Sequence, residues 1–268
     1  MSGGVVQWRA GGKDAGMCTL SVIMLPRSSG FRVVMNRDEQ RARAAARRPV
    51  WHEMPRGLRA IWPEDAAAGG TWIAARSAKH ADGLGPRLPA MVAALTNLNP
   101  QREGVLATAA LARSRGSVVP SVIGAATASA AINLASMLDL TRLLPFRLVA
   151  VDTEESPLGR EMPRVFWMTW DGRDVVRARE PGTSACFASS GLGDERVLAR
   201  LPLFEELVGG GGPGAQDRFH RHVWEDRPEV SVMMSRADAR TVSITTVEVR
   251  GGQAKMEYEV IEAVPAAG

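Results

Sequence analysis

Two apolar runs rich in β-branched residues, 18–24 and 31–36, are separated by a short segment, 26–30, with the composition of a turn. This pattern predicts a β-hairpin. The first run begins at Cys18, and the second ends in the polar tetrapeptide Asn36-Arg37-Asp38-Glu39. Because antiparallel strands return to the same edge, the hairpin would bring Cys18 and this tetrapeptide together at one edge of a sheet.

Further along the chain, strand patterns come in blocks that helical patterns separate. We expect strands at 69–74, 90–97, 145–151, 165–170, 175–179, 186–189, 230–234, 241–249 and 256–261. We expect helices at 103–113, 121–138 and 195–208, the last interrupted at Pro202. Consecutive strands pair most simply as antiparallel neighbours, so this order predicts an α+β fold with mostly antiparallel sheets.

The length of 268 residues permits one or two domains, and nothing in the pattern requires two. Residues 1–17 show neither strand alternation nor a helical period, so we expect an unstructured leader or a miscalled start. A single domain is expected at 18–262, followed by a tail at 263–268.

Composition excludes several classes of protein. The apolar share is 45% and the charged share 23%, which is typical of a globular chain and not of a disordered one. Acidic residues are interspersed with the basic ones, 29 against 33, so the arginine bias does not indicate a nucleic-acid surface. The uncharged run 118–138 contains Ser, Thr and Asn between its apolar residues, which favours a helix buried in protein over a membrane span.

Two cysteines, Cys18 and Cys186, do not make a disulfide framework, and the chain does not begin with a basic segment followed by an apolar one. We therefore expect a cytoplasmic protein. The four histidines lack the spacing of a metal site, and no Gly-x-Ser-x-Gly element is present. Neither a metal centre nor a Ser-His-Asp hydrolase is expected.

Cys18 follows Met17, and an initiator methionine is removed when the next residue is small. If the chain then began at Cys18, this residue would carry both a thiol and a free α-amine. The amine has a reference pKa of about 7.7–8.0, so near neutral pH a fraction of it accepts a proton from the thiol. One residue would supply both the nucleophile and its base.

An ordered series of motifs carries a family resemblance. In order, the motifs are Cys18, Asn36-Arg37-Asp38-Glu39, Gly69-Gly70-Thr71-Trp72, Ala93-Ala94-Leu95-Thr96-Asn97, Ser114-Arg115-Gly116, the strand 145–152, Ser189-Ser190-Gly191-Leu192 and Arg240-Thr241-Val242-Ser243. Over roughly residues 17–259 the series resembles the Asn-Arg-Asp-Glu family, also called the transport and Golgi organisation protein 2 family. That family resembles N-terminal-nucleophile hydrolases of the bile-salt hydrolase and penicillin acylase kind. The resemblance implies a four-layer αββα sandwich.

Four residues are predicted to have catalytic roles, and the resemblance implies those of Asp38 and Asn97. Cys18 would be the nucleophile, Asp38 would hold its α-ammonium, and Asn97 would donate its amide to a developing oxyanion. Arg37 would lower the pKa of the thiol. Arg37 directly precedes Asp38 here, and neighbouring strand residues face opposite sides, so only one of them can face Cys18. We expect this to be Asp38, with Arg37 or Asn36 in a structural role such as capping the turn.

Asn36, Trp72 and Arg240 belong to the same motifs and are the predicted substrate-binding residues. The two glycines before Trp72 would leave room for close approach of another group to the backbone. The arginine-rich stretch 41–48 has two interpretations, a solvated turn or a rim that faces an anion.

Two functional classes follow from the resemblance. The first is a cysteine amide hydrolase or acyltransferase, acting on non-peptide C–N bonds of a small or amphiphilic acyl substrate without a cofactor. The second is a non-catalytic carrier of the same fold that binds haem, a lipid or an acyl-CoA as cargo. A third interpretation assigns the whole motif to a buried polar network that holds the sheet edge together without catalysis.

Overall fold

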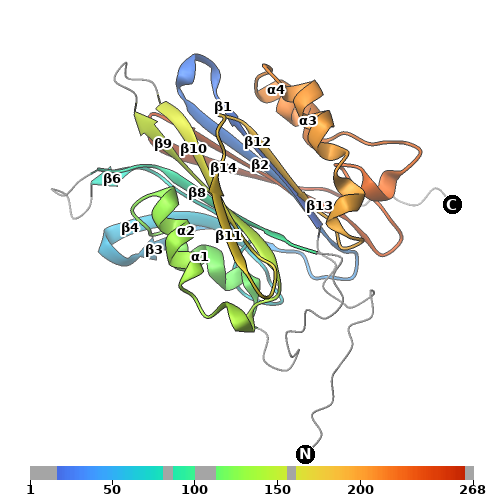
Figure 1. The fold of residues 1–268 in the computed structure, drawn as a ribbon, viewed down its shortest axis with the longest axis horizontal. Coiled ribbons are helices and arrows are strands. Elements are labelled where there is room, and N and C mark those ends of the chain that lie inside the picture. Colours follow the sequence, from blue (N-terminus) through green and yellow to red (C-terminus); the bar gives the residue numbers. More distant parts are fainter. Residues whose placement is uncertain (1–16, 81–86, 100–112, 156–160, 263–268) are drawn as a thin grey trace, which may run out of the picture.

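The computed structural model of the chain describes residues 17–80, 87–99, 113–155 and 161–262. In these residues the fold is built on two large antiparallel sheets (Figure 1). The five-stranded sheet has the order β12 (Ala185–Ser189), β1 (Met17–Met24), β2 (Gly30–Gln40), β13 (Ala239–Arg250), β14 (Gln253–Val260). The seven-stranded sheet has the order β11 (Val175–Arg179), β10 (Glu161–Trp170), β9 (Phe146–Glu155), β8 (Met91–Asn97), β5 (Ile73–Arg76), β4 (Leu58–Glu64), β3 (Arg47–Met54). A short ribbon pairs β6 (Lys79–His80) with β7 (Arg87–Leu88).

The predicted N-terminal hairpin is confirmed. β1 and β2 pair antiparallel, with Cys18 opposite Arg37 and Met17 opposite Asp38. Gly30 begins β2 at φ 123°, and a Cβ there would lie 1.9 Å from the Val249 carbonyl oxygen, so only glycine fits this turn. Met17, which the sequence placed in the leader, is the first residue of β1, while the rest of the predicted leader and the tail lie outside the described residues.

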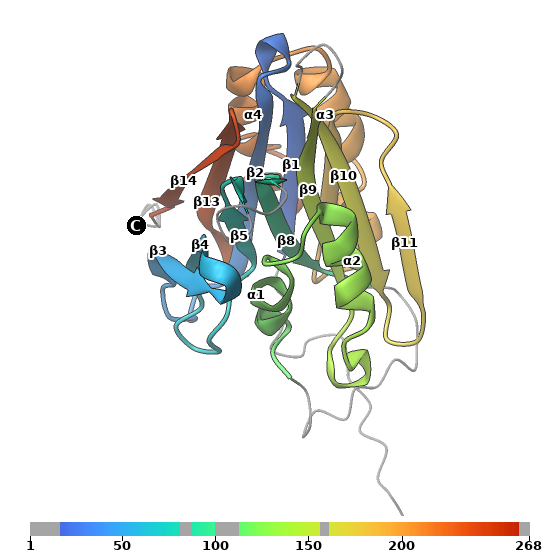
Figure 2. The ribbon, with the colours of Figure 1, turned by 90° about the vertical axis from the view of Figure 1, so that its left-hand side faces the viewer.

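Each sheet packs against the other sheet on one face and against two helices on the other face (Figure 2). α1 (Val118–Val122) and α2 (Ala128–Ser136) contact β8, β9 and β10. On the five-stranded sheet, α3 (Arg200–Val208) contacts β12, and α4 (Pro213–His220) contacts β1 and β2. The expected α+β class with mostly antiparallel sheets is confirmed.

The predicted helix 121–138 is two helices. α1 ends at Val122, and α2 begins at Ala128 after a turn. Thr127 starts α2, because its Oγ1 accepts a hydrogen bond from the Ala130 amide at 3.1 Å. The Asp152 carboxylate accepts a second one from the Ala128 amide at 2.8 Å. The predicted helix 103–113 lies outside the described residues except for Arg113.

Several elements differ from the sequence prediction. The expected strand 230–234 is instead the end of a 3-10 turn, Pro228–Val230, followed by bends, because the Ser231 hydroxyl bonds the Trp224 backbone. β3, β4 and α4 carried no clear apolar period and were not predicted. α3 includes Pro202 without interruption, because the proline lies in its first turn, where no intrahelical N–H bond is lost. No helix in the described part of the chain is long and apolar enough to cross a membrane.

Candidate functional site

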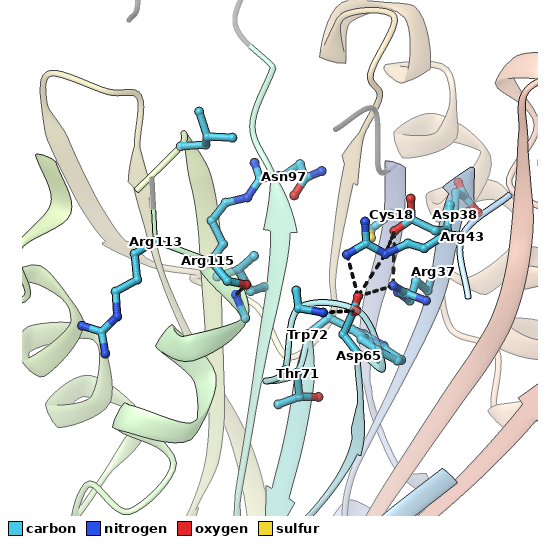
Figure 3. A pocket seen from close by; sticks show the side chains of 17 residues that line it. Cys18, Arg37, Asp38, Arg43, Asp65, Thr71, Trp72, Asn97, Arg113 and Arg115 are labelled. Atoms are coloured by element: carbon cyan, nitrogen blue, oxygen red, sulfur yellow. Dashed lines mark hydrogen bonds and ion pairs between the residues drawn. The ribbon is translucent and has the colours of Figure 1, made fainter. Parts of the chain in front are cut away.

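A pocket of about 330 Å³ opens where β1 begins and β2 and β8 end. Its wall includes Cys18, the charged end of β2, the segment 65–72 and the turn 113–116 (Figure 3). This volume lies at the small end of the range for ligand-binding pockets. The expected meeting of Cys18 and the polar tetrapeptide at one sheet edge is thus confirmed.

Cys18 points into the space between the two sheets, on the same face of β1 as Leu20 and Val22. It is buried, with 7% of its surface exposed. Its backbone N–H donates a hydrogen bond to Ser189 Oγ at 3.2 Å. Burial, and then the Asp38 carboxylate, raise the pKa of the Cys18 thiol to about 12, against the opposing effect of Arg37. With residue 17 attached, the thiol is therefore neutral at physiological pH.

The expectation that Asp38, rather than Arg37, shares the face of Cys18 is wrong. Arg37 lies directly opposite Cys18 in the register, and opposite residues of antiparallel strands have their side chains on one face. The Arg37 guanidinium stacks on the Trp72 ring at 4.3 Å, inside the pocket wall. Arg37 is therefore the residue of the tetrapeptide whose side chain shares the face of the thiol, although Asp38 also lines the pocket and has the larger effect on the pKa of the thiol.

Arg37 is part of a compact cluster of two arginines and two carboxylates. Its Nη2 donates to Asp65 Oδ2 at 2.7 Å and to Glu39 Oε2 at 3.2 Å. Arg43 donates to the same Asp65 oxygen at 3.0 Å and pairs with Glu39 at 3.4 Å. Figure 3 shows the side chains converging on Asp65. The sequence of the stretch 41–48 has two interpretations, a solvated turn or a rim that faces an anion. It contributes one arginine, Arg43, to the pocket, and this arginine is paired with carboxylates of the protein itself.

Sequence reasoning missed Asp65. Its Oδ1 accepts hydrogen bonds from the Ala67 and Ala68 amides at 2.9 and 3.0 Å, so it shapes its own turn as well as holding the arginines. These bonds and the two guanidinium groups hold the pKa of this carboxyl below its usual range, although burial raises it. The only local signal for Asp65 in the sequence is that an acidic residue precedes a turn of small residues. This signal indicates a turn but does not indicate a contact with Arg37.

Asp38 lies on the opposite face of β2, toward α3. Its Oδ1 accepts a hydrogen bond from Thr241 Oγ1 at 2.6 Å, and its Oδ2 is buried without a hydrogen-bond partner among the described residues. Burial raises the pKa of this carboxyl to about 6, although Arg200 and Thr241 stabilise its charge. A buried carboxylate oxygen without a donor is costly, so this one requires an explanation.

Asn97 and Trp72, two other predicted site residues, do line the pocket. Asn97 is the last residue of β8 in the seven-stranded sheet, whereas Cys18 lies at the start of β1 in the five-stranded sheet, so the pocket has wall residues from both sheets. The Nε1 of Trp72 is buried, and no acceptor for it lies among the described residues. Of the two glycines, only Gly70 is closely approached by the chain itself, because a Cβ there would lie 2.5 Å from the Gly116 carbonyl oxygen, whereas a Cβ at Gly69 would meet nothing within 4 Å.

Asn36 and Arg240, which the sequence predicts as substrate-binding residues, are not in the wall of this pocket. Asn36 Nδ2 donates to the backbone carbonyls of His220 and Val232, both at 2.9 Å, so its Oδ1 accepts from His220 Nδ1 at 2.8 Å. The other ring nitrogen then accepts from Ser21 Oγ at 2.6 Å. Asn36, His220 and Ser21 are all fully buried, so this network is structural. Arg240 binds the Ile261 carbonyl.

This network predicts an acid-sensitive stability. Burial, with help from Arg32, lowers the pKa of His220 to about 3. His220 therefore binds a proton below about pH 6.5 in the unfolded chain, but it binds one only near pH 3 in the folded chain. Stability falls as pH falls through this window, with a slope of up to about 1.4 kcal/mol per pH unit. Urea unfolding of His220→Gln between these pH values should give a smaller slope than the wild type.

Asp38 supplies the opposite control. Its folded pKa of about 6 lies above the ordinary value, so the folded state binds this proton first as pH falls, and the carboxyl opposes the effect of His220. Asp38→Asn should therefore make the acid-side slope steeper. Equal slopes in the wild type and His220→Gln would contradict the assignment of a neutral His220.

Within the described residues, no group of three His, Cys, Asp or Glu side chains is arranged to hold a metal ion. The second cysteine, Cys186, lies on β12 with its side chain toward α3, and burial raises the pKa of its thiol to about 12. It does not line the pocket.

Comparison with known protein families gives a match. The model of the family described as Transport and Golgi organisation 2 matches residues 17–187, which is more than half of the 268-residue chain. The matched segment includes Cys18, the tetrapeptide, Trp72 and Asn97, and it ends inside β12. No curated protein matches the chain.

Proposed function

Because this chain belongs to the transport and Golgi organisation 2 family, we propose that it is a cysteine amide hydrolase or acyltransferase whose nucleophile, Cys18, is the first residue of the active form. We assign its fold to the four-layer αββα sandwich of N-terminal-nucleophile hydrolases. The order helices, sheet, sheet, helices supports this assignment. The substrate is a small or amphiphilic acyl amide or ester, as the pocket volume of about 330 Å³ suggests.

The observation that carries the proposal is the unpartnered Oδ2 of Asp38. Met17 lies directly opposite Asp38 in the β1–β2 register. Removal of residue 17 creates an ammonium group one residue from this position, and an ammonium is the donor that a buried carboxylate needs. Ser189 Oγ, already 3.2 Å from the Cys18 nitrogen, would hold the same amine from the β12 side.

The reaction follows from these positions. The free α-amine takes the proton of the thiol, and Sγ attacks the acyl carbon, so that a C–S bond forms and the carbonyl electrons move to oxygen. Asn97 donates its amide N–H to this oxyanion. As the carbonyl reforms, the C–N bond breaks and the leaving amine takes the proton from the α-ammonium. Water, or an acceptor nucleophile in an acyltransferase, then cleaves the thioester and regenerates Cys18.

The test is a panel of acyl amides and acyl esters, assayed with a chain whose N-terminus is shown to be Cys18 by intact mass. Turnover that disappears in Cys18→Ala supports the proposal. Absence of turnover across the panel, with the N-terminus at Cys18, contradicts it.

The role of Asn97 makes a separate prediction. Asn97→Ala should lower turnover by roughly two to three orders of magnitude, because one oxyanion donor is lost. Its melting temperature should stay within a few degrees of the wild type, which corresponds to about 1 kcal/mol. Asn99→Ala is the matched control, because Asn99 lies two residues further and contacts Asp194 instead of the pocket. Equal activity in the two variants would remove Asn97 from the mechanism.

A second candidate function is the binding and transport of haem, a lipid or an acyl-CoA. It is supported by the protonation state and burial of the Cys18 thiol. With residue 17 attached, Cys18 has a pKa of about 12 and 7% exposure, which is not the state of a nucleophile. A chain that keeps residue 17 would then use the pocket only for binding. Titration of haem and of an acyl-CoA into Cys18→Ala tests this function. Normal binding by that variant, together with an inactive wild type, would favour the carrier.

A further inference from the structure

Arg200 is one of the largest fully buried side chains of the protein, and the proposed reaction does not yet use it. It is the first residue of α3 and lies on the helix side of the five-stranded sheet. Its guanidinium donates to three neutral oxygens: Thr19 Oγ1 at 2.6 Å, the Ser231 carbonyl at 2.7 Å and the Val230 carbonyl at 3.1 Å. A buried cation held only by neutral acceptors needs a counter-charge nearby.

The location of Arg200 identifies that counter-charge. Thr19 follows Cys18 in β1, so the guanidinium lies behind the first residues of this strand. Among the carboxylates that act on Arg200, Asp38 contributes most, and Arg200 in turn is the group that most favours the charged form of Asp38. The two side chains lie on the same face of the sheet, which is the face opposite the Cys18 thiol.

We propose that Arg200 is a positioning residue for the Cys18 centre, which fixes the start of β1 through Thr19 and holds Asp38 as a carboxylate behind the N-terminal position of the nucleophile. This inference rests on the proposed function, because it assigns Asp38 the task of binding the α-ammonium. The family match ends before Arg200, so the role comes from the structure of this chain.

Other groups also act on Asp38, and the proposal takes them into account. Arg236, in the turn before β13, favours the charged carboxylate, and Glu39 on β2 opposes it. Thr241 on β13 donates a hydrogen bond to Oδ1. Arg236 lies 2.7 Å from the carboxylate of the exposed Asp238, and its Nε and Nη1 have no hydrogen-bond partner among the described residues, whereas the hydrogen bonds of Arg200 all go to neutral atoms. Of the two cations, Arg200 favours the charged form of Asp38 more strongly and has no ion-paired carboxylate of its own among the described residues.

The direct test is the titration of Asp38, followed by ¹³C NMR of the carboxyl carbon in the full chain and assigned by loss of the signal in Asp38→Asn. In Arg200→Gln the pKa of Asp38 should rise by about one to three units, the usual effect of losing a nearby opposite charge. Arg200→Lys, which keeps the charge, should shift it by less than about one unit.

Arg76→Gln is the matched control, because Arg76 is equally buried but binds backbone carbonyls at the other face of the seven-stranded sheet. It should destabilise the chain and leave the Asp38 titration unchanged. An unchanged titration in Arg200→Gln, or an equal shift in Arg76→Gln, would overturn the proposal.

A double substitution keeps the proposal testable if Arg200→Gln does not fold. In an Arg200→Met background, Asp38→Asn removes a carboxylate that has lost its cation and should raise the urea midpoint. The same change in the wild type should not raise it. A midpoint that Asp38→Asn lowers in both backgrounds would show that Arg200 has no charge partner in Asp38.

The reaction supplies an independent readout. This readout uses a chain that begins at Cys18, in which iodoacetamide alkylates the thiol more slowly as the pH falls. The pH at which this rate falls off should be higher in Arg200→Gln than in the wild type. In Arg200→Lys it should return toward the wild-type value. If Asp38 titrates as expected but the chain hydrolyses no amide or ester, the positioning of Asp38 stands and the hydrolase proposal fails. If the chain hydrolyses substrate but neither the Asp38 titration nor the alkylation profile moves in Arg200→Gln, the hydrolase proposal stands and the proposed role of Arg200 is wrong.

Discussion

A chain that begins at Cys18 should turn over its acyl substrate at least about 10³-fold faster than one in which residue 17 remains attached. In the longer chain the pKa of the thiol is about 12, so at neutral pH only about one molecule in 10⁵ carries a thiolate. The α-amine is at the same time an amide and accepts no proton, and a missing general base costs roughly 10²–10⁴ in rate.

The measurement uses one preparation with a protease site placed directly before Cys18. Turnover is assayed before and after cleavage, and the new N-terminus is confirmed by intact mass. The cleaved Cys186→Ser variant is the control, because Cys186 lies outside the pocket and should leave turnover unchanged. An uncleaved chain that is as active as the cleaved one would exclude the N-terminal nucleophile.

Replacement of Arg76 by Met should destabilise the protein by about 3–5 kcal/mol, because three backbone carbonyls lose their donor at a cost of about 1–3 kcal/mol each. Arg76 is 1% exposed. Its guanidinium donates to the carbonyls of Pro89, Ile123 and Ala125 at 2.7, 2.9 and 2.7 Å, which joins β5 to the turn between α1 and α2. Without it, these buried carbonyls lose their donor.

At about 2–4 °C per kcal/mol for a chain of this size, the melting temperature should fall by roughly 6–20 °C. Arg59→Met is the matched control, because Arg59 is 57% exposed and pairs with an exposed Glu53. It should change stability by less than about 0.5 kcal/mol. Similar melting temperatures for the two variants would mean that the turn at 123–126 is held by other contacts.

The sequence by itself determined the strand hairpin and the meeting of Cys18 with the tetrapeptide at one sheet edge. Both follow from local information, since two β-branched runs around a turn leave the chain few alternatives. It also placed Trp72 and Asn97, at strand ends, in the wall of the pocket. The helical segments were less well defined, because the alanine-rich stretch 118–138 carries no local signal for the turn that divides it.

Only the tertiary structure decided which residue of the tetrapeptide faces the thiol. β2 is buried on both faces over nearly its whole length, so its sequence has no alternation of apolar and polar residues to show which side lies between the sheets.

The partners of the site were also decided by tertiary contacts. Asp65 meets Arg37 across 28 residues, Asn36 meets His220 across 184, and Arg200 meets Thr19 across 181. Each contact requires the packing of separate sheets, helices and turns, and the residues near each partner in the chain carry no trace of it. The local sequence thus placed Cys18 and its strand, whereas long-range packing set the charges around it.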